Sequence, residues 1–148
     1  MDTIEIKYIN ESYLNKAVKM IYNLEVASGR MIDDKRIYDL FKCFIITEFI
    51  DENGKFLGLF KEDKLIGVSG LIDNYIMFFY IDSKYQKNGY GALLLSKQIE
   101  ESNGYDYLYL DAPLESYPFY LKQGFEIDSI KEKENRVVHK MKKIIRRS

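Results

Sequence analysis

One continuous stretch, residues 75–99, constrains the fold more than any other part of the sequence. Residues 75–82 form an almost unbroken apolar run, which predicts a strand buried on both faces. A polar loop follows, and then apolar residues recur at helical spacing as far as Ile99. The stretch therefore predicts a buried strand, a loop and a helix, with Gly89 and Gly91 where the helix begins.

The start of this helix has the properties of an anion-binding site. The first N–H groups of a helix have no partner inside it, and the helix dipole adds partial positive charge there. Gly89 and Gly91 lack the Cβ atoms that would keep a phosphate away. Two glycines near a helix start also occur in plain turns, and the loop matches neither the P-loop nor the dinucleotide-binding fingerprint. The loop therefore predicts a phosphorylated ligand of unspecified kind.

Helical spacing marks two segments near the N-terminus. The first, which Asn10 or Ser12 would cap and Gly29 would end, has its stripe at Leu14, Ala17, Val18, Ile21 and Glu25. The second begins after Asp33 and Asp34, whose charges suit a helix N-terminus. Its apolar stripe consists of Ile37, Leu40, Phe41, Phe44 and Ile45.

The remaining patterns complete an α+β fold. They predict strands at residues 4–9, 56–60, 65–72, 107–110, 125–130 and 136–141, a loop at 51–54 and a short helix at 114–123. A helix between two strands implies a right-handed crossover, so residues 107–110 should run parallel to the strand that ends at Asp82. The predicted order is β-α-α-β-β-β-α-β-α-β-β in a mixed, mostly antiparallel sheet. A chain of 148 residues suits one domain, residues 1–148.

Charge and cysteine content exclude several classes of function. Lys and Arg number 22 against 23 Asp and Glu, and this net charge of −1 argues against general nucleic-acid binding. One cysteine permits no intrachain disulfide, and with one histidine it builds no usual metal site. Cys43 lies in the apolar pattern of the second helix, which predicts a buried thiol. Without a signal-peptide pattern or a membrane-length apolar run, we expect a cytoplasmic protein with no membrane partner.

Two motifs give the sequence a family resemblance. Residues 86–91 read Gln-x-x-Gly-x-Gly, and residues 120–125 read Tyr-x-x-x-Gly-Phe. The first resembles the pyrophosphate-binding motif of the GNAT superfamily of acyl-CoA-dependent N-acyltransferases, and the second resembles that family's segment after the fifth strand. The resemblance extends over about the whole chain, and the order of elements agrees with it. One departure is Pro113, where many members carry Asn.

The resemblance implies a fold with helices on both faces of the sheet and an acyl-CoA site. In the family the fourth and fifth strands splay apart, and pantetheine bonds to backbone of the fourth, here Phe79, Tyr80 and Ile81. A backbone N–H there would polarise the thioester carbonyl. The pyrophosphate would bind the loop and first helical turn, namely Gln86, Lys87, Asn88, Gly89, Tyr90, Gly91 and Ala92. The implied reaction is acetyl transfer from acetyl-CoA to a primary amine, by direct attack in a ternary complex and without a metal.

The resemblance also implies a general acid. Expulsion of a thiolate favours a positioned phenol that protonates it, and Tyr120 is the candidate; the alternative is a tyrosine that only packs on the sheet. Tyr117, one turn earlier, is a weaker rival. The amine must lose a proton before it attacks, and the candidate bases are Glu48, Asp82, Asp111, His139 and water. A lone histidine between Val and Lys in a terminal strand is more often structural, and the sequence does not decide among these groups.

Other functions remain open at this point. A non-catalytic acyl-CoA sensor or interaction module would keep the loop and the splayed strands but turn over no amine. The acceptor is a small molecule or a peptide, and the family shapes its side of the site from segments that correspond here to residues 27–34, 49–54 and 131–135. Their acidic groups could attract a cationic amine. Edge strands in such sheets commonly pair, which leaves a homodimer open.

Overall fold

The computed structural model describes residues 3–50, 54–133 and 136–145, and their elements follow the predicted order. They are β1 Ile4–Tyr8, α1 Glu11–Ala27, α2 Lys35–Ile50, β2 Gly54–Lys61, β3 Lys64–Ile72, β4 Tyr75–Ile81, a 3₁₀ turn Ser83–Tyr85, α3 Tyr90–Glu100, β5 Tyr107–Pro113, α4 Tyr117–Lys122, β6 Glu126–Lys133 and β7 Arg136–Ile144. The α+β class is confirmed. No helix in these described ranges is long and apolar enough to cross a membrane.

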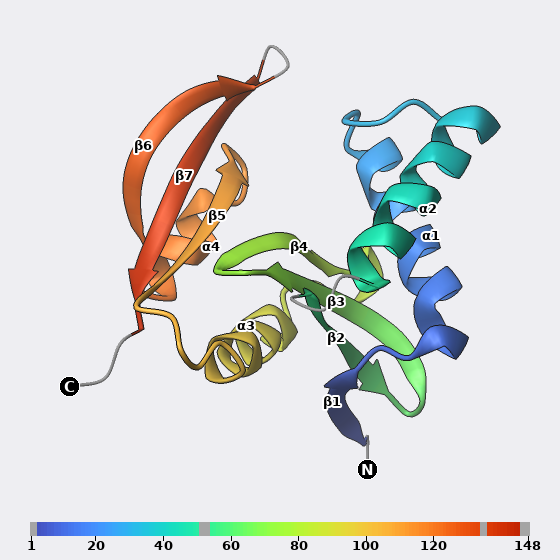
Figure 1. Ribbon diagram of the computed structural model, residues 1–148, viewed down its shortest axis with the longest axis horizontal. Coiled ribbons are helices and arrows are strands. Elements are labelled where there is room, and N and C mark those ends of the chain that lie inside the picture. The colour runs from blue at the N-terminus through green and yellow to red at the C-terminus, as the bar shows by residue number, and fades with distance from the viewer. Residues whose placement is uncertain (1–2, 51–53, 134–135, 146–148) are drawn as a thin grey trace.

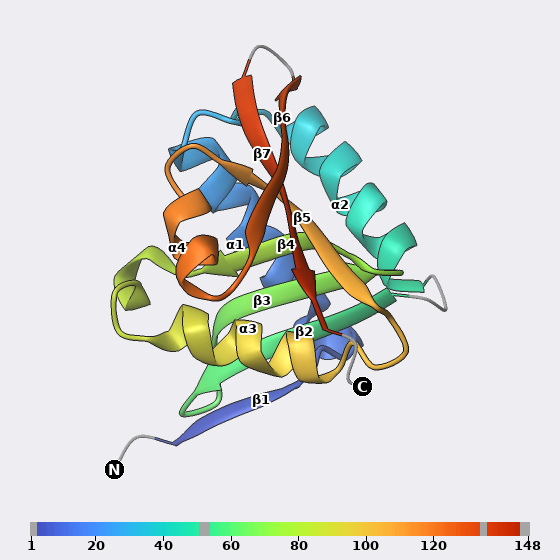
Figure 2. The same cartoon turned by 90° about the vertical axis from the view of Figure 1, so that its left-hand side faces the viewer.

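The described strands form one sheet in the order β1-β2-β3-β4-β5-β7-β6. Every neighbouring pair is antiparallel except β4 and β5, which are parallel and are joined through α3. Helices α1 and α2 pack on one face of the sheet, and α3 and α4 pack on the other (Figures 1 and 2). Helices on both faces explain why β4 carries apolar side chains on both of its sides.

Strands β4 and β5 pair over only two positions and then separate. The pairs are Tyr75 with Tyr109 and Ile76 with Leu110. We call the unpaired parts of these strands, residues 77–81 of β4 and 111–113 of β5, the splayed end. Figure 1 shows β5, β6 and β7 standing apart from the β1–β4 part of the sheet. The splayed central strands that the family resemblance implies are therefore present.

A β-bulge begins the splayed end. Gly70 of β3 pairs with Phe78 while Leu71 pairs with Ile76, so Met77 is the extra residue on β4. A bulge bends its strand and reverses the side to which later residues point. After it, Phe78 and Tyr80 pack toward α1 and α2, whereas Phe79 packs toward α3 and α4.

Local sequence explains where the first two helices begin. The Asn10 side chain accepts a hydrogen bond from the Ser12 amide at 3.0 Å, so Asn10 is the N-cap of α1. Asp34 caps α2 in the same way by accepting from the Arg36 amide at 2.8 Å. The chain leaves α1 through Gly29, whose φ of 78° is in the left-handed region.

Three of the predictions for α2 are wrong in detail. Ile45 is buried, but Leu40 and Phe44 are 69% and 46% exposed, and Cys43 is exposed rather than buried. The reason is geometric: the buried line of α2 runs through Tyr38, Phe41 and Ile45, spaced by three and four residues. An apolar stripe wider than this line leaves its flanks in solvent, and Cys43 lies 200° around the helix from Phe41.

The other differences concern α3, the hairpins and one loop. In α3 the fully buried residues are Leu94, Leu95 and Gln98, and the polar Gln98 was not expected to face the sheet. The β2–β3 hairpin turns at Glu62 and Asp63 with φ of 50° and 69°, a type I′ turn made without glycine. Strand β6 extends further toward the β6–β7 hairpin than predicted, and β7 extends further at its C-terminal end. Residues 51–53 of the predicted loop lie outside the described residues.

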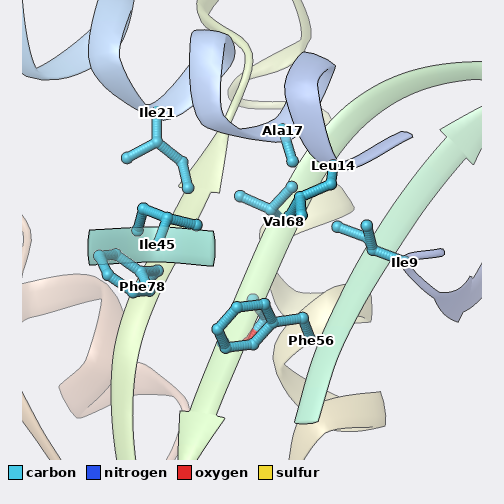
Figure 3. Close-up of a pocket in the computed structure, with 10 residues that line it drawn as sticks. Ile9, Leu14, Ala17, Ile21, Ile45, Phe56, Val68 and Phe78 are labelled. Carbon is cyan, nitrogen blue, oxygen red and sulfur yellow. The ribbon is translucent and has the colours of Figure 1, made fainter. Parts of the chain in front are cut away.

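A small apolar cavity of about 20 Å³ lies under α1 and α2 (Figure 3). It is lined by Ile9, Leu14, Ala17, Ile21, Ile45, Phe56, Val68, Ser69, Gly70 and Phe78. The loop before α3 contributes nothing to this lining. The cavity is therefore a packing gap in the α1–α2 core and is separate from the predicted anion site.

Candidate active site

The loop before α3 presents a run of backbone N–H groups. The first bond of α3 runs from the Leu93 amide to the Gly89 carbonyl at 3.2 Å, and the amides of residues 87–92 have no acceptor among the described residues. Lys87 and Gly89 have φ of 66° and 81°. Residues with positive φ next to ordinary ones turn successive N–H groups toward one side, which makes a concave site for an anion. The loop therefore has the geometry that a phosphate requires.

The polar side chains of this loop bond to its own backbone. Gln86 Nε2 donates to the Ile81 carbonyl at 2.9 Å. Asn88 Nδ2 donates to the carbonyls of Tyr85 at 3.2 Å and Gln86 at 3.0 Å. These bonds hold the loop folded, so Gln86 and Asn88 act on its shape, and the N–H groups remain available to a ligand.

Gly89 and Gly91 require glycine for different structural reasons. A Cβ added at Gly89 would meet nothing within 4 Å, so its positive φ is what favours glycine there. A Cβ added at Gly91 would lie 3.3 Å from Phe119 Cζ on α4. Gly91 therefore lets α4 pack against the first turn of α3, a reason that the sequence did not indicate.

The ladder between β3 and β4 decides which backbone groups of β4 face the splayed end. The Asp82 amide donates to the Ile66 carbonyl at 2.8 Å. Hydrogen-bonded pairs alternate along an antiparallel ladder, so the backbone groups of Tyr80 also point toward β3. Those of Phe79 and Ile81 point the other way, toward β5. Of the three residues predicted to hold pantetheine, the backbone of Tyr80 is thus turned away.

Tyr120 lies where α4 meets β4. Its side chain is only 7% exposed, and its ring contacts Phe79, with centroids 6.0 Å apart, as well as Phe119 and Phe125. Its hydroxyl has no partner among the described residues. The fully enclosed polar atoms that lack a partner there belong to Gln98 and His139, so the Tyr120 hydroxyl keeps an opening to solvent. Burial raises the pKa of Tyr120, which keeps the phenol protonated at neutral pH.

Three of the candidate bases take part in interactions that hold the fold together. Asp82 accepts from the Lys84 amide at 3.0 Å and caps the 3₁₀ turn. Asp111 accepts from the Tyr75 hydroxyl and pairs with Lys131 at 3.1 Å. The third, the histidine of β7, is described below together with the rival tyrosine of α4.

His139 and Tyr117 stack on each other. Their ring centroids are 4.3 Å apart, with 19° between the planes. The histidine is 6% exposed, and its Nδ1 has no partner in the described part of the chain. Both residues therefore contribute to packing between α4 and β7. Glu48, the remaining candidate, is half-buried on α2.

Sequence reasoning missed a polar network beside the splayed end. The Tyr80 hydroxyl donates to Glu25 Oε1 at 2.6 Å. Arg30 Nε lies 3.2 and 3.3 Å from the two oxygens of Glu25, and Arg30 Nη1 donates to Glu115 Oε1 at 2.7 Å. The available signal was the spacing of α1, because Glu25 continues the buried stripe four residues after Ile21.

The charges of this network shift two pKa values. Burial raises the pKa of Tyr80, and the Glu25 carboxylate raises it further, so the phenol stays neutral and donates. Burial alone would lower the pKa of Arg30, but the charges of Glu25 and Glu115 outweigh it and raise that pKa. Among the described residues, no three His, Cys, Asp or Glu side chains gather as a metal site would need.

Three solved structures with a similar fold are named as acetyltransferases. An aminoglycoside 6'-acetyltransferase type Ii superposes with a TM-score of 0.78 at 19% identity, covering 97% of this chain and 99% of that chain. A GNAT-family acetyltransferase from Staphylococcus aureus Mu50 gives 0.77 at 20% identity, with 97% and 100% coverage. The PaiA N-acetyltransferase from Thermoplasma acidophilum, in complex with coenzyme A, gives 0.73 at 19% identity, with 96% and 99% coverage.

The family assignment comes from the sequence itself. No curated protein matches the chain. The family model described as an acetyltransferase (GNAT) domain matches residues 22–145, which include both the loop before α3 and the Tyr120 segment. These residues are most of the chain, and their fold is that of the solved acetyltransferases. The chain therefore belongs to the GNAT acetyltransferase family.

Proposed function

We propose that this protein transfers an acetyl group from acetyl-CoA to a primary amine, by direct attack in a ternary complex. The observation that carries the proposal is the row of unpartnered amides at residues 87–92, which follows the splayed end of β4 after the 3₁₀ turn. A pyrophosphate suits such a row. Two of the similar folds support the ligand and the acceptor class: one was solved with coenzyme A, and another is named for acetylation of an aminoglycoside.

Each part of the site would have a defined task. Acetyl-CoA supplies an activated acyl group as a thioester. The amides of residues 87–92 would bind its pyrophosphate, while the backbone groups of Phe79 and the N–H of Ile81 would bind the pantetheine and polarise the carbonyl. The Tyr120 hydroxyl, which is free of protein partners within the described residues, would donate its proton to the leaving thiolate.

A thiol-release assay with acetyl-CoA and a panel of primary amines tests the proposal. We expect release with at least one amine, and Tyr120→Phe should lower turnover by about 10²–10⁴-fold. Calorimetry should find acetyl-CoA affinity within about threefold of wild type, because the substitution leaves the phosphate loop intact. Acetyl-CoA binding without thiol release on any amine would contradict catalysis and favour a sensor or interaction module.

A further inference from the structure

A mostly buried carboxylate faces the sheet at the end of α1. The Glu25 side chain is only 13% exposed, and it continues the stripe of residues by which α1 packs on the sheet. A charge in this position is costly unless it is paired and hydrogen-bonded. Its partners are Arg30, which follows α1, and the hydroxyl of Tyr80 on β4. A carboxylate can accept about four hydrogen bonds, so Glu25 keeps capacity to accept more.

Tyr80 connects this carboxylate to the splayed end. It lies between Phe79 and Ile81, whose backbone groups face β5. Its own side chain turns toward α1, where its hydroxyl meets Glu25 at 2.6 Å. On the opposite side of β4, the neighbouring residue Phe79 contacts the ring of Tyr120, so Tyr80 and Tyr120 approach the same part of the strand from its two sides.

The proposed reaction needs a proton acceptor at this place. A primary amine has a pKa of about 10 and reaches the site mostly as an ammonium ion, which has no lone pair for attack. Asp82 caps the 3₁₀ turn after β4, and Asp111 is bonded to β4 through Tyr75, which lies in the paired part of that strand. Glu25 is the carboxylate that contacts the splayed end of β4 through a hydroxyl.

We propose that Glu25 accepts the proton of the acceptor ammonium through the hydroxyl of Tyr80, an inference that rests on the proposed function. One N–H bond of the ammonium breaks as an O–H bond forms on Tyr80. The original O–H bond of Tyr80 breaks as an O–H bond forms on Glu25. The net change is one proton moved from nitrogen to carboxylate, which leaves a neutral amine at the splayed end and a neutral phenol on Tyr80.

The other charged groups around Glu25 have supporting tasks. Arg30 contacts both carboxylate oxygens and fixes their orientation, and Glu115, after β5, holds Arg30 from the other side. Tyr80 approaches the carboxylate from β4 and donates its hydroxyl hydrogen to it. In this relay Glu25 would act on the substrate through another side chain and is a positioning residue, whereas Tyr80 would touch the acceptor.

The first test compares three substitutions with an amine that wild type acetylates. Glu25→Gln preserves shape and a hydrogen-bond acceptor but cannot take a proton, so kcat should fall about 10²-fold or more while KM changes less. Tyr80→Phe should cause a similar loss. The double variant should be no more than about threefold worse than either single one, because the two groups act in series. Glu25→Asp should recover part of kcat.

A pH profile separates proton transfer from a structural role. Above about pH 9 the amine is increasingly neutral in solution, so the ratio of wild-type to Glu25→Gln turnover should shrink as pH rises from 7 to 9.5. A constant ratio would overturn the relay. Glu11→Gln, the same change at an exposed position of α1, is the matched control and should retain turnover.

One measurement does not depend on turnover. Calorimetric affinity for acetyl-CoA should stay within about threefold of wild type in Glu25→Gln. If wild type acetylates no amine, the proposed function fails. If wild type is active and Glu25→Gln matches it, the relay alone fails.

Discussion

The hydroxyl of Tyr75 on β4 donates to the carboxylate of Asp111 on β5, at the point where the two strands stop pairing. The last paired residues are Ile76 and Leu110, so this hydrogen bond connects the two strands just before they separate. The Tyr75 ring also stacks on Tyr109, with centroids 6.1 Å apart. Side chains thus continue the connection between the strands after their backbones have separated.

Tyr75→Phe tests this connection. The ring and its stack remain and only the hydroxyl is lost, so the free energy of unfolding should fall by about 1 kcal/mol, since Tyr75 is partly exposed. Urea denaturation with an unchanged m-value measures the effect. Tyr107→Phe, at an exposed position of β5, is the control. A Tyr75→Phe protein as stable as wild type would show that the strands need no such bond.

The buried pair of Ser69 and Gln98 gives a second prediction. Ser69 Oγ donates to Gln98 Oε1 at 2.7 Å, and Gln98 Nε2 has no partner among the described residues. Ser69→Ala should cost about 1–3 kcal/mol, because it leaves both ends of a buried amide unpaired. Adding Gln98→Leu should return stability to about the wild-type value or above it. If the double variant is less stable than Ser69→Ala, the amide has a packing role that leucine cannot fill.

The two glycines of the loop should respond differently to alanine. At Gly89 there is space but a φ of 81°, so alanine should cost about 1–2 kcal/mol of stability and weaken acetyl-CoA binding by calorimetry. At Gly91 the obstacle is the Phe119 ring, so Phe119→Leu should relieve the effect of alanine there and leave the Gly89→Ala effect unchanged. Equal relief at both positions would contradict this distinction.

Alkaline pH should destabilise the fold through Tyr80 and Tyr120. Both folded-state pKa values are raised, chiefly by burial, whereas the unfolded phenols lose their protons near about pH 10. Below that pH the contribution is fully present. Above it the unfolded state binds fewer protons, so stability should fall by about 1.4 kcal/mol per pH unit for each tyrosine. Urea titrations from pH 9 to 11 should give a shallower fall of unfolding free energy with pH for Tyr120→Phe than for wild type. Equal slopes would show that the pKa of Tyr120 is not raised in the folded state.

Hydrophobic periodicity predicted the order of elements because each helix and strand must bury one face. It could not tell how wide that face is. Leu40 and Phe44 widen the apolar stripe of α2 beyond the line of residues that is buried against its neighbours. Gln98 is buried, but a pattern based on apolar residues does not mark a glutamine as buried. Both failures arise because burial depends on which other elements cover a helix, and the sequence of the helix itself does not give that information.

The geometry of the candidate site was predictable where it depends on local backbone and unpredictable where it depends on distant contacts. The loop of residues 86–91 is contiguous, so its glycines and the following helix predicted an anion site. The bulge at Met77 sets the direction of Tyr80, and bulges leave little trace in a sequence. Glu25 and Tyr80 lie 55 positions apart and meet only through the packing of α1 on the sheet.

The contact between Gly91 and Phe119 joins the first turn of α3 to α4, the helix that carries Tyr120. Phe119 is adjacent to Tyr120, and its ring packs against the first turn of α3, where Gly91 has no side chain to keep it away. The position of the first turn of α3 and the position of α4, which carries Tyr120, are therefore set together by the packing of a single aromatic ring.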